Sequence, residues 1–102
     1  MIVVLCTIPV GKGEELAEKI INSRLAGCVN IINSVKSIYH WQGKVEKDNE
    51  ELLIIKTRED LFEELKEFIK QNHPYTVPEI VALNVKDVNK EYLEWLIKET
   101  KV

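Results

Sequence analysis

The fold is decided by residues 28–57, which read CVNIINSVKSIYHWQGKVEKDNEELLIIKT. The first half, up to Trp41, has an extended pattern, but its apolar side chains do not all share one parity, because Ile32 and Ile38 fall on the opposite one. We therefore expect a bulge or bend near Asn33-Ser34. Gln42-Gly43-Lys44 is typical of a hairpin turn, and the run Leu52–Ile55 beyond it is typical of a buried strand. These residues predict two long antiparallel strands joined by a tight turn.

The residues before this stretch predict a buried strand and then a helix. Ile2–Ile8 is a continuous apolar run rich in valine and isoleucine, and Pro9 ends it, as is usual for a central strand. Glu14–Ala26 has the period of a helix, and Gly27 suits the position just after its end. One stripe of that helix gathers its apolar residues, Leu16, Ala17, Ile20, Ile21 and Leu25.

The residues after it predict a helix, a strand and a second helix. Thr57 resembles a helix cap that forms a capping box with Asp60, and Pro74 stops the helix that follows. Val77–Val85 is typical of a fourth strand, and Asn89 is suited to cap a last helix. The apolar face of the first of these helices is formed by Leu61, Phe62, Leu65, Phe68 and Ile69.

The order of elements is therefore β-α-β-β-α-β-α, which makes the chain an α+β protein. The first six elements form the ferredoxin-like pattern, and the last is an extra C-terminal helix. We expect one domain over residues 1–102, with an antiparallel sheet in the order 4-1-3-2 and both main helices on one face. The other face, and the apolar hairpin near Tyr39 and Trp41, need a cover, so the pattern predicts an oligomer.

Composition excludes several classes of function. The 102 residues carry a formal charge of −3, which disfavours a broad basic surface for nucleic acid. The two central strands, Ile2–Ile8 and Leu52–Ile55, lack the aromatic residues on which an RNA-recognition domain stacks bases. The first nine residues lack the basic start of a signal peptide and are too short to span a membrane. We expect a soluble cytoplasmic protein with reduced cysteines.

Cys6 and His73 are the candidate metal ligands. The first strand ends near Cys6, and its antiparallel neighbour begins after His73, so the topology places both residues at one end of the sheet. A thiolate and an imidazole are ligands that hold copper or zinc. The alternative is structural: a cysteine in a buried strand acts as a small apolar residue, and a histidine before proline ties its loop by a hydrogen bond.

No enzyme class fits the remaining residues. The loop Val10–Gly13 lies between a strand and a helix, as phosphate loops do, but it lacks the P-loop motif. An acylphosphatase-like enzyme would need an arginine there, and the only arginines are Arg24 and Arg58. With His40 and His73 as the only histidines, no Ser-His-Asp set can be located. We therefore expect a protein without catalytic residues or an organic cofactor.

Several motifs together resemble one known family. In chain order they are VVLCT (3–7), RLAGCVN (24–30), YHWQGK (39–44), IKT (55–57), HPYTVPE (73–79) and YLEW (92–95). In this order and spacing the chain resembles the CutA divalent-cation tolerance proteins over nearly its whole length.

The resemblance implies a cytoplasmic homotrimer, built like the PII signalling proteins, with a role in tolerance of copper and other divalent cations. It implies copper ligation by Cys6 and His73, with Asn72 where some relatives have a second histidine, and hence a weakly bound metal. The alternative is a PII-like regulatory scaffold that binds a small ligand or partner protein in the clefts between its subunits.

Overall fold

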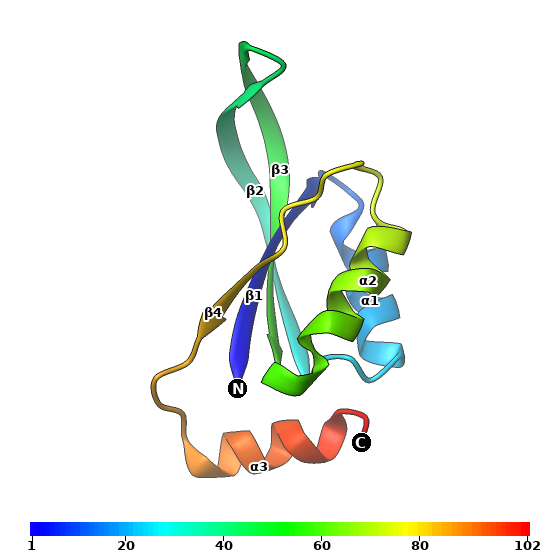
Figure 1. Cartoon of the computed structure of the whole chain (residues 1–102), viewed down its shortest axis with the longest axis vertical. Coiled ribbons are helices and arrows are strands. Elements are labelled where there is room, and N and C mark those ends of the chain that lie inside the picture. Colours follow the sequence, from blue (N-terminus) through cyan, green and yellow to red (C-terminus); the bar gives the residue numbers. More distant parts are fainter.

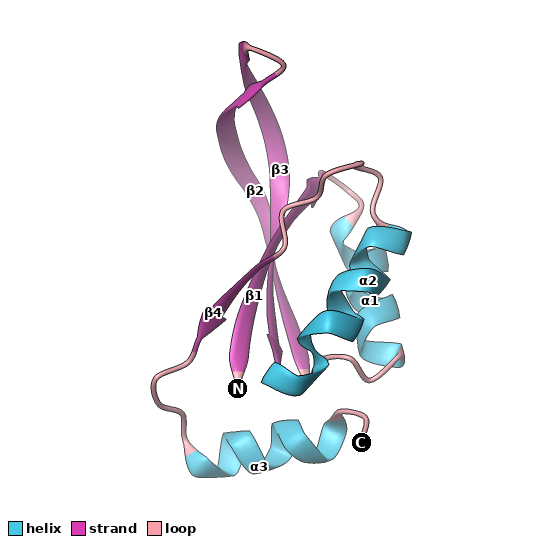
Figure 2. Cartoon of the chain, viewed as in Figure 1, coloured by secondary structure: helices cyan, strands magenta, loops and turns pink.

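The computed structural model describes all 102 residues and contains one four-stranded antiparallel sheet and three α-helices (Figures 1 and 2). The strands lie in the order β2-β3-β1-β4. This order confirms the ferredoxin-like arrangement with an added C-terminal helix. A 3₁₀ turn, Glu59–Leu61, precedes α2. The bounds are β1 Ile2–Pro9, α1 Gly13–Asn22, β2 Cys28–Trp41, β3 Lys44–Thr57, α2 Phe62–Asn72, β4 Val81–Asn84 and α3 Lys90–Glu99.

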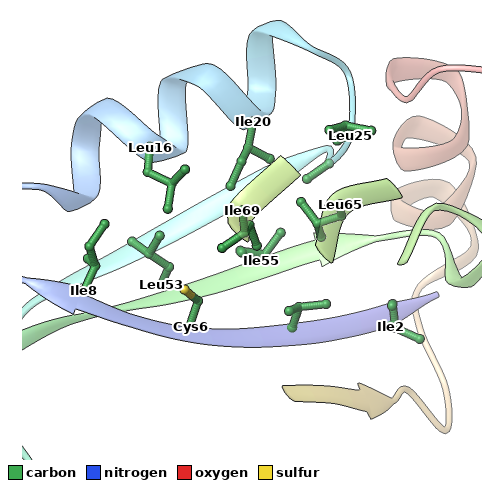
Figure 3. Close-up of a cluster of buried hydrophobic side chains, with 12 residues drawn as sticks. Ile2, Cys6, Ile8, Leu16, Ile20, Leu25, Leu53, Ile55, Leu65 and Ile69 are labelled. Atoms are coloured by element: carbon green, nitrogen blue, oxygen red, sulfur yellow. The ribbon is translucent and has the colours of Figure 1, made fainter. Parts of the chain in front are cut away.

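The core lies between the sheet and the helices α1 and α2, which both cover the same face (Figure 1). Alternate residues of β1 point into it, because successive side chains of a strand face opposite sides. Strand β3 contributes Leu53 and Ile55, both fully buried. The helices meet them with four aliphatic side chains (Figure 3). These are Leu16 and Ile20 of α1 and Leu65 and Ile69 of α2.

The opposite face of the sheet has no helix over it, and we call it the open face. Its apolar side chains are half-buried or exposed, and Ile32, Val81 and Leu83 keep 44%, 46% and 48% of their surface in solvent. Helix α3 crosses the end of the sheet instead of covering this face (Figure 1). The open face comprises Val3, Leu5, Ile32, Leu52, Ile54, Val81 and Leu83.

Strands β2 and β3 form a hairpin that extends well beyond the rest of the protein (Figure 1). The expected bulge is confirmed, because the β2–β3 register shifts between Ile32 and Val35. The expected turn is also confirmed: Gln42 and Gly43 both have positive φ, 51° and 80°, as a type I′ turn requires. The projecting part exposes apolar side chains, among them Trp41 at 47%.

Helix α1 ends at Asn22, so it is shorter than the predicted helix Glu14–Ala26. Arg24 takes the left-handed conformation, φ 57°, that the sequence suggested for Gly27. Leu25 then turns into the core. Gly27 serves close packing instead, since a Cβ atom there would lie 2.6 Å from Leu96 Cδ1 of α3.

Two other sequence predictions are wrong in their details. Thr57 does not cap a helix: its hydroxyl donates to the carbonyl oxygen of Leu25 at 2.7 Å, and the 3₁₀ turn begins after Arg58. Strand β4 spans Val81–Asn84 and not Val77–Val85, because it pairs only with the first half of β1. Asn89 does cap α3 as expected, accepting from the backbone N–H of Glu91.

None of the helices is long and apolar enough to cross a membrane.

The start of α1 is held by Glu51, and we expect Glu51→Gln to destabilise the fold. Glu51 is 8% exposed, and its two carboxylate oxygens accept from the backbone N–H groups of Gly13 at 2.8 Å and Gly11 at 3.1 Å. The amide removes the negative charge from the helix N-terminus and one of the two acceptors, so the free energy of unfolding should fall by about 1–3 kcal/mol. Urea unfolding at pH 7 and fixed protein concentration measures this loss.

Glu18→Gln is the matched control, because Glu18 is an exposed residue of the same helix with no ion pair. It should unfold at the wild-type urea concentration. An unchanged midpoint for Glu51→Gln would contradict the anchoring role of this carboxylate.

Candidate functional site

The predicted ligands Cys6 and His73 lie at the same end of β1 and meet at one atom, the carbonyl oxygen of Thr7. The Cys6 Sγ lies 3.7 Å from this oxygen, and the His73 Nε2 lies 2.8 Å from it. β1 places Cys6 directly, while His73 is the extended residue that ends α2. The topology thus brings together two donors that are 67 positions apart in the sequence.

Both ring nitrogens of His73 are engaged in hydrogen bonds. The Nδ1 atom accepts from the backbone N–H of Tyr75 at 3.0 Å, so it bears no proton. The Nε2 atom therefore carries the proton and donates to Thr7, which assigns the neutral tautomer. The ring is 9% exposed and ties the loop after α2 to the end of β1. A metal ion would have to take the place of one of these two hydrogen bonds.

The Cys6 side chain is fully buried in the core, where Figure 3 shows its sulfur among aliphatic side chains. Burial, together with the negative charges of Glu79 and Glu50, raises the pKa of its thiol to about 12. Cys6 is therefore a protonated thiol at neutral pH. It can bind a metal as thiolate only by releasing that proton.

The two side chains are of the donor types that copper prefers, but two donors are too few to complete the coordination of a metal ion. Sulfur and imidazole nitrogen are the donors that copper prefers over hard oxygen ligands. No group of three or more His, Cys, Asp or Glu side chains in the chain is arranged to hold a metal ion. A metal on Cys6 and His73 would need further ligands, such as water.

A pocket of about 730 Å³ adjoins this end of β1, between the projecting part of the hairpin and the loop after α2. Its walls combine aromatic and apolar side chains with two carboxylates. The buried one, Glu50, is 4% exposed and accepts from the Tyr75 hydroxyl at 2.8 Å. The lining residues are Thr7, Ser37, Ile38, Tyr39, Trp41, Glu50, Pro74, Tyr75, Thr76, Val77 and Glu79.

The pocket is electrically negative. Burial, the hydrogen bond to Glu50 and the charge of Asp48 all raise the pKa of Tyr75. Tyr39 donates its hydroxyl to Asp48, and this bond raises the pKa of Tyr39 to about 12. No lysine, arginine or histidine lines the pocket, and neither Glu50 nor Glu79 forms an ion pair.

Sequence reasoning missed this pocket as a site. Its carboxylates and aromatic rings come from the hairpin and the loop after α2, which no single motif joins. A signal was present in β3, where the acidic residues 46, 48 and 50 alternate and so share one face of the strand.

The other residues considered from the sequence lie elsewhere. Cys28 is half-buried at the start of β2, with Sγ 3.8 Å from Asn30 Oδ1, and His40 is exposed on the hairpin. The loop Val10–Gly13 does not offer its backbone to phosphate, because Glu51 already accepts from two of its N–H groups.

Comparison with known proteins gives a consistent result. The profile of the family described as CutA1 divalent ion tolerance protein matches residues 2–99. The chain is 52% identical over 101 residues to the protein named CutA 1, chloroplastic, of Oryza sativa, covering 98% of this chain and 57% of the rice protein. It is 48% identical over 102 residues to the divalent-cation tolerance protein CutA of Pyrococcus horikoshii, covering 99% of each.

Solved structures agree with these sequences. The crystal structure of CutA1 from Pyrococcus horikoshii superposes on all of this chain with a TM-score of 0.95, at 47% identity and 100% coverage of both chains. The PII-like protein CutA from Nostoc sp. PCC 7120, in its apo form, gives a TM-score of 0.94 at 33% identity, covering 99% of this chain and 98% of that one.

Proposed function

This chain belongs to the CutA1 family, and from that membership we propose that it acts in divalent-cation tolerance as a cytoplasmic, non-enzymatic homotrimer that binds copper through Cys6 and His73. The relatives that match it over nearly their full length are named for divalent-cation tolerance. The chain spans little more than half of the rice relative, whose name places it in the chloroplast. The compartment and the assembly are therefore part of the proposal.

The observation that carries the metal assignment is the meeting of Cys6 and His73 at the carbonyl oxygen of Thr7. A thiolate and an imidazole at one point favour copper over magnesium or calcium, which prefer cages of oxygen ligands. The carboxylates Glu50 and Glu79, whose charges reach Cys6, add an attraction for any cation that approaches.

The same geometry supports a weak and exchangeable site. Binding must displace a proton from a buried thiol and break a hydrogen bond of His73. Two protein donors also occupy only half of the positions around a four-coordinate metal, as in open sites that keep bound water. A site of this kind suits sensing or buffering of metal better than a permanent structural metal.

The open face supports the homotrimer. It is apolar, and no element of the same protomer covers it. Apolar patches of this kind on soluble proteins mark contact surfaces, and most soluble oligomers are closed symmetric assemblies of one chain. If neighbouring subunits covered the open face and the edges of the long hairpin, neither the apolar surface nor the unpaired strand edges would remain exposed.

A second candidate function is supported by the pocket beside β1. Ligand sites in proteins are concave, largely apolar, and equipped with a few polar groups, and the 730 Å³ pocket has these properties. The fold is shared with a protein named PII-like. In this alternative the chain is a regulatory scaffold that binds a small ligand, and metal binding is incidental.

Copper binding at Cys6 should strengthen as the pH rises. The thiol pKa of about 12 lies above the whole neutral range, so binding as thiolate releases one proton there. The apparent association constant should then rise by up to about tenfold per pH unit between roughly pH 6.5 and 8.5. Competition titration against a chelator of known pH dependence measures it.

Magnesium and calcium serve as controls and should show no comparable binding in the same range. Copper affinity that is independent of pH, once the chelator is corrected for, would contradict ligation by a buried thiol. Retention of a stoichiometric small molecule in place of metal after dialysis would favour the scaffold.

A further inference from the structure

Copper that binds at Cys6 and His73 needs a route from solvent, because neither side chain lies at the surface. Cys6 is fully buried, and His73 is 9% exposed. In the homotrimer proposed above, neighbouring subunits cover the open face and close the approach from that side. The Cys6 side chain points the other way, into the core between the sheet and the helices α1 and α2 (Figure 3). A route to the thiol is therefore sought on the helix side.

A second pocket, of about 370 Å³, lies on this side, between the start of α1 and the end of α2. His73 lines this pocket and does not line the larger one beside the hairpin. Ile8 and Leu16, which also line it, are buried members of the core cluster that contains Cys6. Figure 3 shows Ile8, Leu16 and Cys6 at the same end of this cluster. The pocket thus adjoins both predicted ligands from the side of the helices.

The charges around this second pocket balance, so it does not repel a cation. Lys19 pairs with Glu15 at 3.2 Å, and both residues line the pocket. Lys12 forms no ion pair, but the carboxylate of Glu51 accepts from the backbone N–H groups on either side of it. Two lysines and two carboxylates this close to one another largely cancel.

The end of α2 adds neutral oxygen atoms to the wall. The Asn72 Nδ2 atom donates to the carbonyl oxygen of Phe68 at 2.8 Å, and the Oδ1 atom of Asn72 accepts no hydrogen bond from the chain. Gln71 lines the same wall and is exposed. Amide oxygens are weak ligands for copper compared with sulfur and imidazole nitrogen, so they do not retain an ion that can move on to His73 and Cys6.

We propose that copper enters through this second pocket and reaches the imidazole of His73 before the thiol of Cys6. The hydrogen bond from His73 Nε2 to the carbonyl oxygen of Thr7 is then the last barrier on the route. Ligation through this nitrogen breaks the same bond, so entry and binding share one step. The inference rests on the proposed copper site and adds to it the path by which the site is filled.

The test measures how fast an ion reaches Cys6 in the full chain. In a Cys28→Ala background Cys6 is the only thiol. The probe is methylmercury, a soft cation that binds one thiolate, and the readout is the rate at which free thiol disappears. Gln71→Trp and Lys12→Trp each place a bulky side chain at an exposed position of the second pocket.

We expect each pocket variant to lower the labelling rate by about tenfold, because the bulky ring has to move aside before the probe can pass. The equilibrium affinity for copper should stay that of the parent, since a barrier on the route slows entry and exit alike. The midpoint of urea unfolding should also stay unchanged, because both positions lie at the surface. Either variant gives the answer if the other fails to fold.

Glu18→Trp and Val77→Trp are the matched controls. Glu18 is exposed on α1 and lies outside both pockets, while Val77 is 70% exposed and lines the larger pocket. Both controls should be labelled at the rate of the parent.

Three outcomes would overturn the proposal: unchanged labelling in both pocket variants, slower labelling in Val77→Trp, or labelling of the parent only as fast as the chain unfolds. Each of them leaves copper ligation by Cys6 standing. If copper proves to bind without Cys6, the proposed function fails, and the rates with methylmercury still show by which side the thiol is reached.

Discussion

Leu83→Asp is expected to convert the assembled protein into monomers. Leu83 lies on the edge strand β4, pairs with Val3 of β1, and exposes 48% of its surface on the open face. If neighbouring subunits cover this face, the variant buries an uncompensated carboxylate in an apolar contact, at a cost of about 3–5 kcal/mol for each interface. Light scattering coupled to size-exclusion chromatography at micromolar concentration should show a mass three times that of the chain for the wild type and a single-chain mass for the variant.

Val10→Asp is the control for this substitution. Val10 is 56% exposed in the loop before α1, away from the open face, so the change adds the same charge without reaching the proposed interface. It should elute with the wild type. A wild type that is monomeric at this concentration, or a Leu83→Asp variant with the mass of the wild type, would contradict assembly through the open face.

The second large effect is expected at the metal site, where Cys6→Ala should lower copper affinity by about 100-fold or more. The substitution removes the sulfur donor, which is the softer of the two predicted ligands. His73→Ala should also weaken binding, but it breaks the tie between the loop and Thr7 as well, so Cys6 gives the cleaner test. Calorimetric titration with copper at pH 7.5 measures the loss.

Cys28→Ala is the matched control, since Cys28 is the only other cysteine and lies at the start of β2. Its copper affinity should equal that of the wild type. Thermal unfolding of Cys6→Ala should show a small loss of stability with the fold retained, because alanine fills most of the same space in the core. Equal copper affinity in Cys6→Ala and wild type would exclude Cys6 as a ligand.

Sequence periodicity predicted the fold because the two kinds of element alternate clearly along the chain. The long apolar strands, the helical stripes and the Gln42-Gly43 turn are local signals, and the order of elements then leaves few ways to arrange the sheet. The bulge near residues 33 and 34 was predictable because Ile32 and Ile38 have the opposite parity to the other apolar residues of β2.

The ends of elements were less predictable, because tertiary contacts set them. Helix α1 stops at Asn22 so that Leu25 can enter the core, and Arg24 accepts the left-handed conformation that a glycine usually takes. Thr57 is of a residue type that commonly caps helices, yet its hydroxyl donates instead to the carbonyl oxygen of Leu25, 32 positions earlier. Contacts between distant segments of this kind leave no local pattern in the sequence.

The candidate site shows the same division. Topology predicted that Cys6 and His73 would come near each other, and the two side chains do share the carbonyl oxygen of Thr7. Their protonation was not predictable, because it depends on burial of the thiol and on the bond from the Tyr75 N–H to the imidazole. The acidic pocket was missed because its charge and its rings converge only after folding.

The central claim, copper ligation by Cys6 and His73, is tested most directly by X-ray absorption at the copper edge. One equivalent of Cu(I) per chain is added to the wild-type protein without oxygen, and the nearest scatterers are identified. We expect one sulfur and at least one imidazole nitrogen, and loss of the sulfur scatterer in Cys6→Ala but not in Cys28→Ala. A wild-type spectrum with only oxygen and nitrogen neighbours, or a sulfur scatterer that persists in Cys6→Ala, would contradict the assignment.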